Sequence, residues 1–311
     1  YRFNHQNCAP LVDYVEGIQN MMKGSASSKM LLLAVKFPWL RYIPIVKKQA
    51  FDVHKARWTM LMGYIVNEVN KCRETYREDE EPANFVHAYM KKAETNPFLT
   101  DDNLVNVCSD LFLAGQETTT TTLRWGALFM ALNQEVQDRL RAEIHSVVGR
   151  DSTVSMADKP KLPYLQASIL ELQRRGNIVS TTSVLMRQTT DEVDIAGHHL
   201  EAGTVVNFDI QMVMATDPLF VNPEEFNPAR YLADDGVTLR KDLVDRTIPF
   251  GIGKRQCAGE GLARVELFVG LATLVQHYRI LPPADGSGIN LTPILTTMRI
   301  PQTHKLQLIP I

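Results

Sequence analysis

One cysteine in this chain stands in a setting that suits metal ligation. Residues 250–259 read Phe-Gly-Ile-Gly-Lys-Arg-Gln-Cys-Ala-Gly, so Cys257 lies in a glycine-spaced loop with Arg255 two positions before it. A thiolate rather than a thiol binds a metal, and nearby cations and helix N-termini favour the thiolate. The apolar run 261–268 predicts a helix whose N-terminus faces the cysteine. Three glycines let the backbone pass close to a large flat group: Gly251, Gly253 and Gly259.

Two other interpretations of this loop need weighing. A free cysteine is most often a small buried hydrophobe. The glycines are also typical of phosphate-binding loops. However, Gln256 occupies the place where Gly-x-Gly-x-x-Gly needs its third glycine, and Lys254 is followed by arginine rather than Ser or Thr. Both phosphate-binding motifs therefore fail on spacing.

A second segment with chemical potential lies in a long predicted helix, from about residue 100 to 132. Residues 114–119 read Ala-Gly-Gln-Glu-Thr-Thr, and helical spacing places Leu111, Ala114, Gly115 and Thr118 on one face. Small residues there permit the close approach of a flat cofactor, whereas glycine and the threonine run 118–122 weaken a helix. A local penalty of this kind is typical of a functional site, although a threonine-rich helical segment by itself is more often structural.

Residues 250–259 resemble the haem-binding loop of the cytochrome P450 family, Phe-x-x-Gly-x-Arg-x-Cys-x-Gly, and every fixed position is met. The resemblance implies that Cys257 is the axial ligand of the iron of haem b and that Arg255 holds a haem propionate. It also implies that Phe250, Gly251 and Gly259 form part of the cofactor site. A cysteine thiolate pushes electron density onto the iron and favours O–O cleavage.

The resemblance extends to the threonine-rich helix. Its sequence is similar to the family signature Ala/Gly-Gly-x-Asp/Glu-Thr-Thr on the helix that crosses the distal face of the haem. This implies that Ala114 and Gly115 approach the cofactor. It also implies that Glu117 and Thr118 deliver protons during oxygen activation, work that needs groups within hydrogen-bond reach.

Two further segments resemble family motifs with a structural role. Glu171 and Arg174 stand one turn apart, a pair that alone contributes only a few tenths of a kcal/mol on a helix surface. In the family, Glu-x-x-Arg pairs with an arginine from a downstream segment, which implies a buried ion-pair network of Glu171, Arg174 and Arg230. Arg187 stands where family members often have a residue that binds a haem propionate. The alternative, given equal weight, is that Arg187 is an exposed arginine on a strand without a role in cofactor binding.

The sequence also departs from the family pattern. Residues 175–178 read Arg-Gly-Asn-Ile where members usually have prolines, so we expect a changed connection to the first strand. The similarity covers nearly all 311 residues but corresponds to the C-terminal two thirds of a typical member. We therefore expect the membrane anchor, the opening strands and the propionate-binding Trp-x-x-x-Arg helix to be missing. Residues 29–48 correspond to the family's substrate-access and membrane-facing region.

The predicted fold class is mainly α with a small β portion. We expect a single P450-like domain over 1–311, with a helical half to about 176 and a part rich in strands, with the haem loop, from about 177. Apolar periodicity predicts helices over 11–22, 50–76, 85–93, 100–132, 133–148 and 163–174. Residues 29–48 are predicted to form a loop. Short strands are expected between 180 and 208, near 278–281 and over 305–309.

Composition, net charge and cysteine content indicate which other classes of protein the chain could belong to. The chain is 45% hydrophobic and 22% charged, with a net charge of −2, which indicates a globular protein and gives no sign of nucleic-acid binding. No stretch approaches the apolar length of about 18 residues that a spanning helix needs. The four cysteines have no disulfide spacing, so a reducing compartment is expected: Cys8, Cys72, Cys108 and Cys257.

The sequence thus predicts a haem-thiolate monooxygenase of the animal microsomal, drug-metabolising type. The resemblance implies a small lipophilic substrate, dioxygen, and electrons from NADPH through a flavoprotein reductase. It also implies a location on the cytosolic face of the endoplasmic reticulum membrane. Two alternatives stay open at this point. One is a truncated fragment that binds haem weakly or not at all. The other is a peroxide-rearranging relative, which the intact Glu117-Thr118 pair disfavours.

Overall fold

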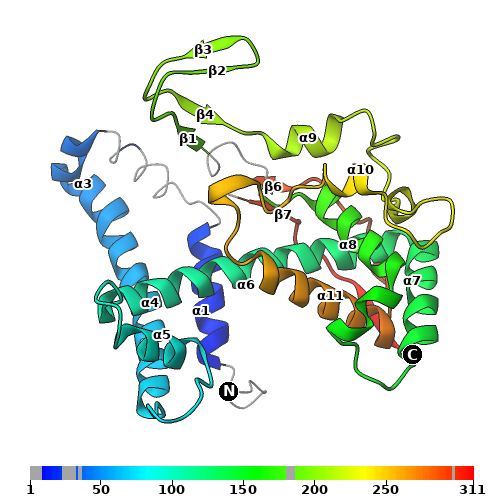
Figure 1. Cartoon of the computed structure of the whole chain (residues 1–311), viewed down its shortest axis with the longest axis horizontal. Coiled ribbons are helices and arrows are strands. Elements are labelled where there is room, and N and C mark those ends of the chain that lie inside the picture. Colours follow the sequence, from blue (N-terminus) through cyan, green and yellow to red (C-terminus); the bar gives the residue numbers. More distant parts are fainter. Residues whose placement is uncertain (1–8, 23–32, 34–36, 180–185, 296–297) are drawn as a thin grey trace. The chain divides into compact units, whose positions relative to one another are not determined.

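The structure, a computed structural model, describes residues 9–22, 33, 37–179, 186–295 and 298–311. The chain divides into two compact units, Tyr1–Ala114 and Gly115–Ile311. Helices predominate, and small antiparallel strand pairs occur in the second unit (Figure 1). This confirms the predicted fold class of helices with a small β portion.

The described part of the first unit consists of helices. In chain order they are α1 (Ala9–Met22), η1 (Pro38–Tyr42), α3 (Pro44–Val46), η2 (Lys47–Asp52), α4 (Val53–Glu74), α5 (Phe85–Ala93) and the start of α6 (Asp101–Leu132). Leu61, Ile65 and Val69 recur every four residues along α4, and all three are buried in one cluster with Tyr14 and Leu104. Trp58, three residues before Leu61, was expected on the same face but is exposed.

The loop predicted over 29–48 is wrong for its second half. Residues 38–42 and 44–46 form short helices, and residues 47–52 a π-helical turn. Pro38 and Pro44 were expected to break regular structure, but each stands at a helix start. There proline is favoured because its missing N–H would have no partner in the helix anyway. Residues 29–32 and 34–36 lie outside the described part of the chain.

Helix α6 runs from the first unit into the second, as the predicted helix over 100–132 requires. The hydroxyl of Thr100 accepts a hydrogen bond of 3.3 Å from the backbone N–H of Asn103, so it caps the helix. Asp101 and Asp102 follow in the first turn, where negative charge complements the helix dipole. The capping residue and the acids explain why the helix begins here.

Helices also form the core of the second unit. They include α7 (Gln134–Val147), η3 (Met156–Lys161), α8 (Pro163–Gly176) and α11 (Glu260–His277), and α11 packs against both α7 and α8. Leu140, Leu165 and Leu271 of these helices are fully buried. Shorter helices lie between α8 and α11: α9 (Ile210–Thr216), η4 (Pro228–Tyr231), α10 (Lys241–Val244) and η5 (Gly253–Arg255).

The strands pair as short antiparallel hairpins and ladders. The pairs are β1 (Met186–Gln188) with β4 (Val205–Asn207), β2 (Val193–Ile195) with β3 (His198–Leu200), β5 (Tyr278–Leu281) with β8 (Gln307–Pro310), and β6 (Ile294–Leu295) with β7 (Arg299–Ile300). The first three pairs lie where strands were predicted. The pair β6–β7 was not predicted, and residues 180–185 lie outside the described part.

Candidate functional site

The loop before α11 is closed by its own backbone. The N–H of Cys257 donates to the carbonyl of Phe250 at 3.0 Å, and the N–H of Gln256 donates to the carbonyl of Gly253 at 3.0 Å. Gly251 and Gly253 have φ values of +72° and +80°, which residues with a Cβ rarely adopt. The glycines therefore allow a turn that carries Cys257 to the start of α11.

The thiol of Cys257 is exposed at the surface of the second unit. It is free, and all residues from 252 to 258 are exposed, including the aliphatic side chain of Ile252 at 74%. Arg255 is exposed too, and its guanidinium makes no hydrogen bond or ion pair with the described residues. Cysteine and isoleucine are among the most often buried residue types. An exposed group of a thiol, a cation and an aliphatic chain is a surface that a bound amphiphilic group would cover.

The threonine-rich segment of α6 presents small residues and a buried acid. The side chain of Glu117 is buried, and Gly115 and Thr118 are half-buried. A Cβ added to Gly115 would meet no atom within 4 Å, so the space beside this glycine is open in the described structure. Ala114, the last residue of the first unit, is exposed on the same helix.

A hydrogen bond joins this segment to the helix that follows the cysteine loop. The hydroxyl of Thr119 donates to Oε2 of Glu266 at 2.9 Å, linking α6 to α11. The two helices also approach closely further along, because a Cβ on Gly270 would lie 3.2 Å from Cδ1 of Leu123. The second unit thus connects the Glu117-Thr118 segment with the helix that starts beside Cys257. The partners Thr119 and Glu266 are 147 residues apart, and the sequence analysis did not identify Glu266.

Glu171, Arg174 and Arg230 lie together in the core of the second unit. Oε2 of Glu171 is 2.8 Å from Nε of Arg174, and its Oε1 is 3.2 Å from Nε of Arg230. The three side chains are 0%, 1% and 7% exposed, respectively. Arg174 also donates to the carbonyl of Met214 in α9. Both arginines donate to backbone carbonyls of the segment that follows α9: Pro223 and Glu225 for Arg174, and Val221, Asn222 and Glu225 for Arg230. The network therefore fastens this segment to α8.

Arg187 lies in β1 on the exposed side of a two-stranded ladder. Its backbone pairs with Val206 of β4, and its guanidinium donates to the carbonyl of Met186 at 2.9 Å. Within the described residues it makes no ion pair. The structure does not bring this side chain into contact with Cys257 or Arg255.

The unusual residues after Glu-x-x-Arg have a packing role. Gly176 ends α8 against Trp125, whose ring atoms would lie 3.6 Å from an added Cβ. Asn177 then adopts a left-handed conformation with φ of 36°, and its N–H donates to the carbonyl of Gln173 at 2.9 Å. Asparagine tolerates this conformation better than most residues with a Cβ. The chain leaves α8 through a helix cap rather than through the expected prolines.

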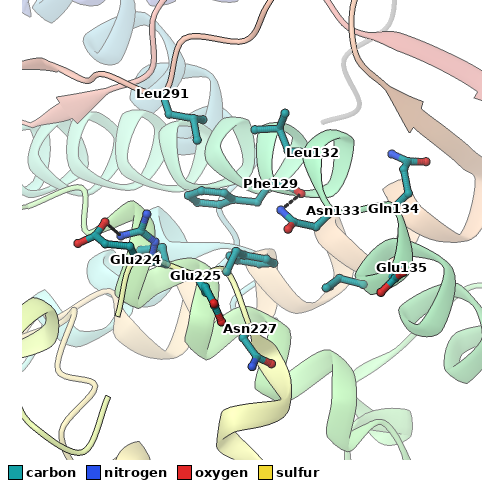
Figure 2. Close-up of a pocket in the computed structure, with 12 residues that line it drawn as sticks. Phe129, Leu132, Asn133, Gln134, Glu135, Glu224, Glu225, Asn227 and Leu291 are labelled. Atoms are coloured by element: carbon teal, nitrogen blue, oxygen red, sulfur yellow. Dashed lines mark hydrogen bonds and ion pairs between the residues drawn. The ribbon is translucent and has the colours of Figure 1, made fainter. Parts of the chain in front are cut away.

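A cavity of about 740 Å³ lies elsewhere in the second unit, at the junction of α6 and α7 (Figure 2). Phe129 and Phe226 stack in it with ring centroids 4.7 Å apart, and Leu132 and Leu291 line the same space. The Arg175–Glu224 ion pair lies at its rim. No residue of 114–119 or 250–259 lines this cavity, so it is separate from the predicted site of chemistry.

Among the described residues, no helix combines the length and apolar character that crossing a membrane requires. The same residues contain no cluster of three or more His, Cys, Asp or Glu side chains suited to a metal ion. Cys72 and Cys108 are free, like Cys257, while Cys8 lies outside the described part.

Comparison with known proteins identifies similar sequences. The family model described as "Cytochrome P450" matches residues 2–308. The chain is 36% identical to rabbit (Oryctolagus cuniculus) cytochrome P450 2J1 over 83% of its length and 52% of the relative's. It is 33% identical to human cytochrome P450 2J2 over 91% and 55%, and 33% identical to dog (Canis lupus familiaris) cytochrome P450 1A1 over 94% and 55%. The chain spans about half the length of these curated relatives.

Proposed function

Because the chain belongs to the cytochrome P450 family, we propose that it carries the haem-thiolate site of a monooxygenase. The reaction proposed is the insertion of one oxygen atom from O2 into a small lipophilic substrate. The observation that carries the proposal is exposed Cys257 in a glycine turn, two residues after Arg255, which is also exposed and makes no hydrogen bond or ion pair with the described residues.

The residues at this site have the chemistry that haem b requires. Its iron takes an axial thiolate, its propionates take cations, and its porphyrin takes apolar and small side chains. Cys257 and Arg255 offer the first two, and Ile252 offers aliphatic surface beside them. The open space beside Gly115 on α6 supports the proposal from a second element of the same unit.

When bound, the haem supplies the redox chemistry that activates dioxygen. The chain's own residues would position the cofactor and move protons. Cys257 Sγ would bind the iron, and the guanidinium of Arg255 would bind a propionate. We assign the same role to Arg187, whose guanidinium would have to exchange its hydrogen bond to the carbonyl of Met186 for the propionate.

Glu117 and Thr118 are the proposed proton-handling residues. The carboxylate of Glu117 would hold a proton inside the protein, where its side chain is 3% exposed, and the hydroxyl Oγ1 of Thr118 would pass one on. Thr119, the next residue, is anchored by its hydrogen bond to Glu266, which limits rotation of this part of α6. The arrangement favours dioxygen chemistry over the rearrangement of peroxides, which does not need proton delivery.

The whole enzyme's partners are part of the same proposal. Electrons would come from NADPH through a flavoprotein reductase, and the protein would sit at the cytosolic face of the endoplasmic reticulum membrane, as the family resemblance of its motifs implies. We also propose that both compact units belong to one P450-like domain, because a single family match covers residues 2–308.

The competing proposal is that the chain is not catalytic and binds haem weakly or not at all, and one experiment separates the possibilities. The 311-residue chain is loaded with haem and combined with a microsomal NADPH-dependent reductase, ¹⁸O-labelled dioxygen and an alkylbenzene probe, whose C–H hydroxylation gives a stable alcohol that keeps the inserted oxygen. A monooxygenase transfers one labelled atom to the product, and Thr118→Val uncouples NADPH use from product formation. If the chain converts an organic hydroperoxide in the absence of reductase, and the product contains no ¹⁸O from dioxygen, the chain is a peroxide-rearranging enzyme. No haem uptake would indicate the non-catalytic fragment.

A further inference from the structure

The side chains around the cysteine loop form a connected cluster that the proposed function does not use. Glu260, the first residue of α11, accepts a short hydrogen bond from the side chain of Gln256. Its other oxygen, Oε1, lies 2.7 Å from Nη2 and 2.8 Å from Nε of Arg264. Arg264 in turn lies over the ring of Phe250, with Cζ 5.1 Å from the centroid. One carboxylate thus connects the residue just before Cys257 to the helix just after it.

A backbone hydrogen bond also connects Phe250, a member of this cluster, to Cys257. Phe250, which the Arg264 guanidinium covers, accepts the hydrogen bond from the N–H of Cys257 at 3.0 Å. The side-chain contacts therefore restrain the residue before the cysteine and the residue that pairs with its backbone. Charge-assisted hydrogen bonds and a cation over an aromatic face are each stronger than neutral polar contacts at the surface.

Few other contacts restrain this loop. Residues 252–258 are exposed, and Gly251 and Gly253 give the backbone wide conformational freedom. Exposed backbone hydrogen bonds with few apolar contacts open more readily than those of the core. The Glu260 cluster is the set of side-chain contacts, within the described residues, that reaches into the loop from α11.

The carboxylate of Glu260 is in the charged state that the cluster needs. Burial raises its pKa, but the hydrogen bonds from Gln256 and Arg264 outweigh burial and hold the pKa below its ordinary value. At neutral pH the Glu260–Arg264 contact is therefore an ion pair.

We propose that Glu260 and Arg264 are positioning residues, which hold the loop of residues 250–257 in the conformation that presents Cys257. This inference rests on the proposed function for its consequence on haem ligation. The structural part, that the ion pair fixes the loop, stands independently and is tested first.

The second unit contains a matched control. Arg246 and Asp217 form an ion pair of 2.8 Å with side chains 42% and 21% exposed, against 2.7 Å, 42% and 20% for Arg264 and Glu260. Asp217→Asn therefore removes a carboxylate of equal exposure and contact length without touching the cysteine loop. A loss of general stability would affect Asp217→Asn and Glu260→Gln alike.

The first measurement is hydrogen–deuterium exchange of the haem-free chain, resolved on peptides covering 250–257. Glu260→Gln should accelerate exchange of these amides about two- to fivefold, the effect expected when a partly exposed ion pair is lost. Arg264→Lys keeps the ion pair and should give a smaller change. Unchanged exchange in Glu260→Gln, or an equal acceleration there in Asp217→Asn, would overturn the proposal.

The second measurement separates this inference from the proposed function. In the haem-loaded chain, the ratio of thiolate-ligated to other carbon monoxide adduct should fall about two- to fivefold in Glu260→Gln and stay constant in Asp217→Asn. A wild-type chain with the thiolate band and an unaltered Glu260→Gln spectrum would refute the positioning role alone. A wild-type chain without that band would refute the proposed function, while the exchange result still decides whether the ion pair holds the loop.

Discussion

Removing the buried carboxylate of Glu171 should be among the most damaging single substitutions in the second unit. Its two oxygens accept hydrogen bonds from Arg174, Arg230 and the backbone N–H of Asn227, at 2.8 to 3.2 Å. The guanidinium side chains are only 1% and 7% exposed. Glu171→Gln would leave both positive charges inside the protein without a counter-charge.

The expected magnitude follows from that burial. Breaking a buried ion pair by removing one partner costs about 3–5 kcal/mol, against a total stability of about 5–15 kcal/mol. At about 2–4 °C per kcal/mol for 150–250 residues, the melting temperature should fall by about 6–20 °C. Glu224→Gln is the control, because Glu224 pairs with the next arginine, Arg175, at 2.9 Å but is 83% exposed. An exposed pair contributes about 0–1 kcal/mol.

Urea unfolding followed by far-ultraviolet circular dichroism measures both free energies of unfolding. If Glu171→Gln does not fold at all, Arg174→Lys provides a graded variant, since it keeps the charge but loses the paired geometry. We expect it to lose about 1–3 kcal/mol. The reasoning would be refuted if Glu171→Gln and Glu224→Gln lost equal stability, since burial would then not set the energy of the pair.

The remaining predictions concern two glycines and a capping acid. Gly115→Ala should stabilise the haem-free chain by about 0.5–1 kcal/mol, because its Cβ meets no atom within 4 Å, yet weaken haem binding in a titration. Gly126→Ala, whose Cβ would lie 3.1 Å from Leu172, should instead cost about 1–3 kcal/mol in urea unfolding, and a gain would contradict the packing. Glu143→Ala should cost about 1–2 kcal/mol, since its oxygens accept the first N–H groups of α8 at 2.8 and 2.9 Å. Burial raises the pKa of Glu143 despite these hydrogen bonds, so its contribution to stability should decrease as pH rises through that pKa, and the variant should lack this pH dependence.

Periodic helices are the part of the fold that the sequence predicted well. In α6 the spacing, the Thr100 cap and the two acids that follow agree with one another, and the helix begins and ends as expected. Residues 38–48 were predicted as part of a loop because proline was taken only as a breaker. Pro38 and Pro44 each stand in the first turn of a helix, where proline is compatible with helical structure. Their place in the first turn could not be recognised before the helix bounds were known.

The candidate site likewise combines residues that local sequence motifs indicate with contacts that no local motif indicates. The residues proposed to do chemistry, above all Cys257 and Glu117, stay predictions, and they could be proposed because their motifs are local in the sequence. Contacts between distant segments were not predictable without a family pattern. The hydrogen bond from Thr119 to Glu266 and the stacking of Arg264 on Phe250 depend on how helices pack, and no local pattern records that packing. The β6–β7 pair was missed because two-residue strands are too short to show alternation.

The absorption spectrum of the reduced carbon monoxide adduct tests the central claim most directly. The 311-residue chain, expressed with haem available, should give the strongly red-shifted band of thiolate-ligated haem. That band should disappear in Cys257→Ala and remain in Cys108→Ala, whose thiol lies in the first unit. An unshifted band in the wild-type chain, or a red-shifted band that persists in Cys257→Ala, would contradict the assignment of Cys257 as the iron ligand.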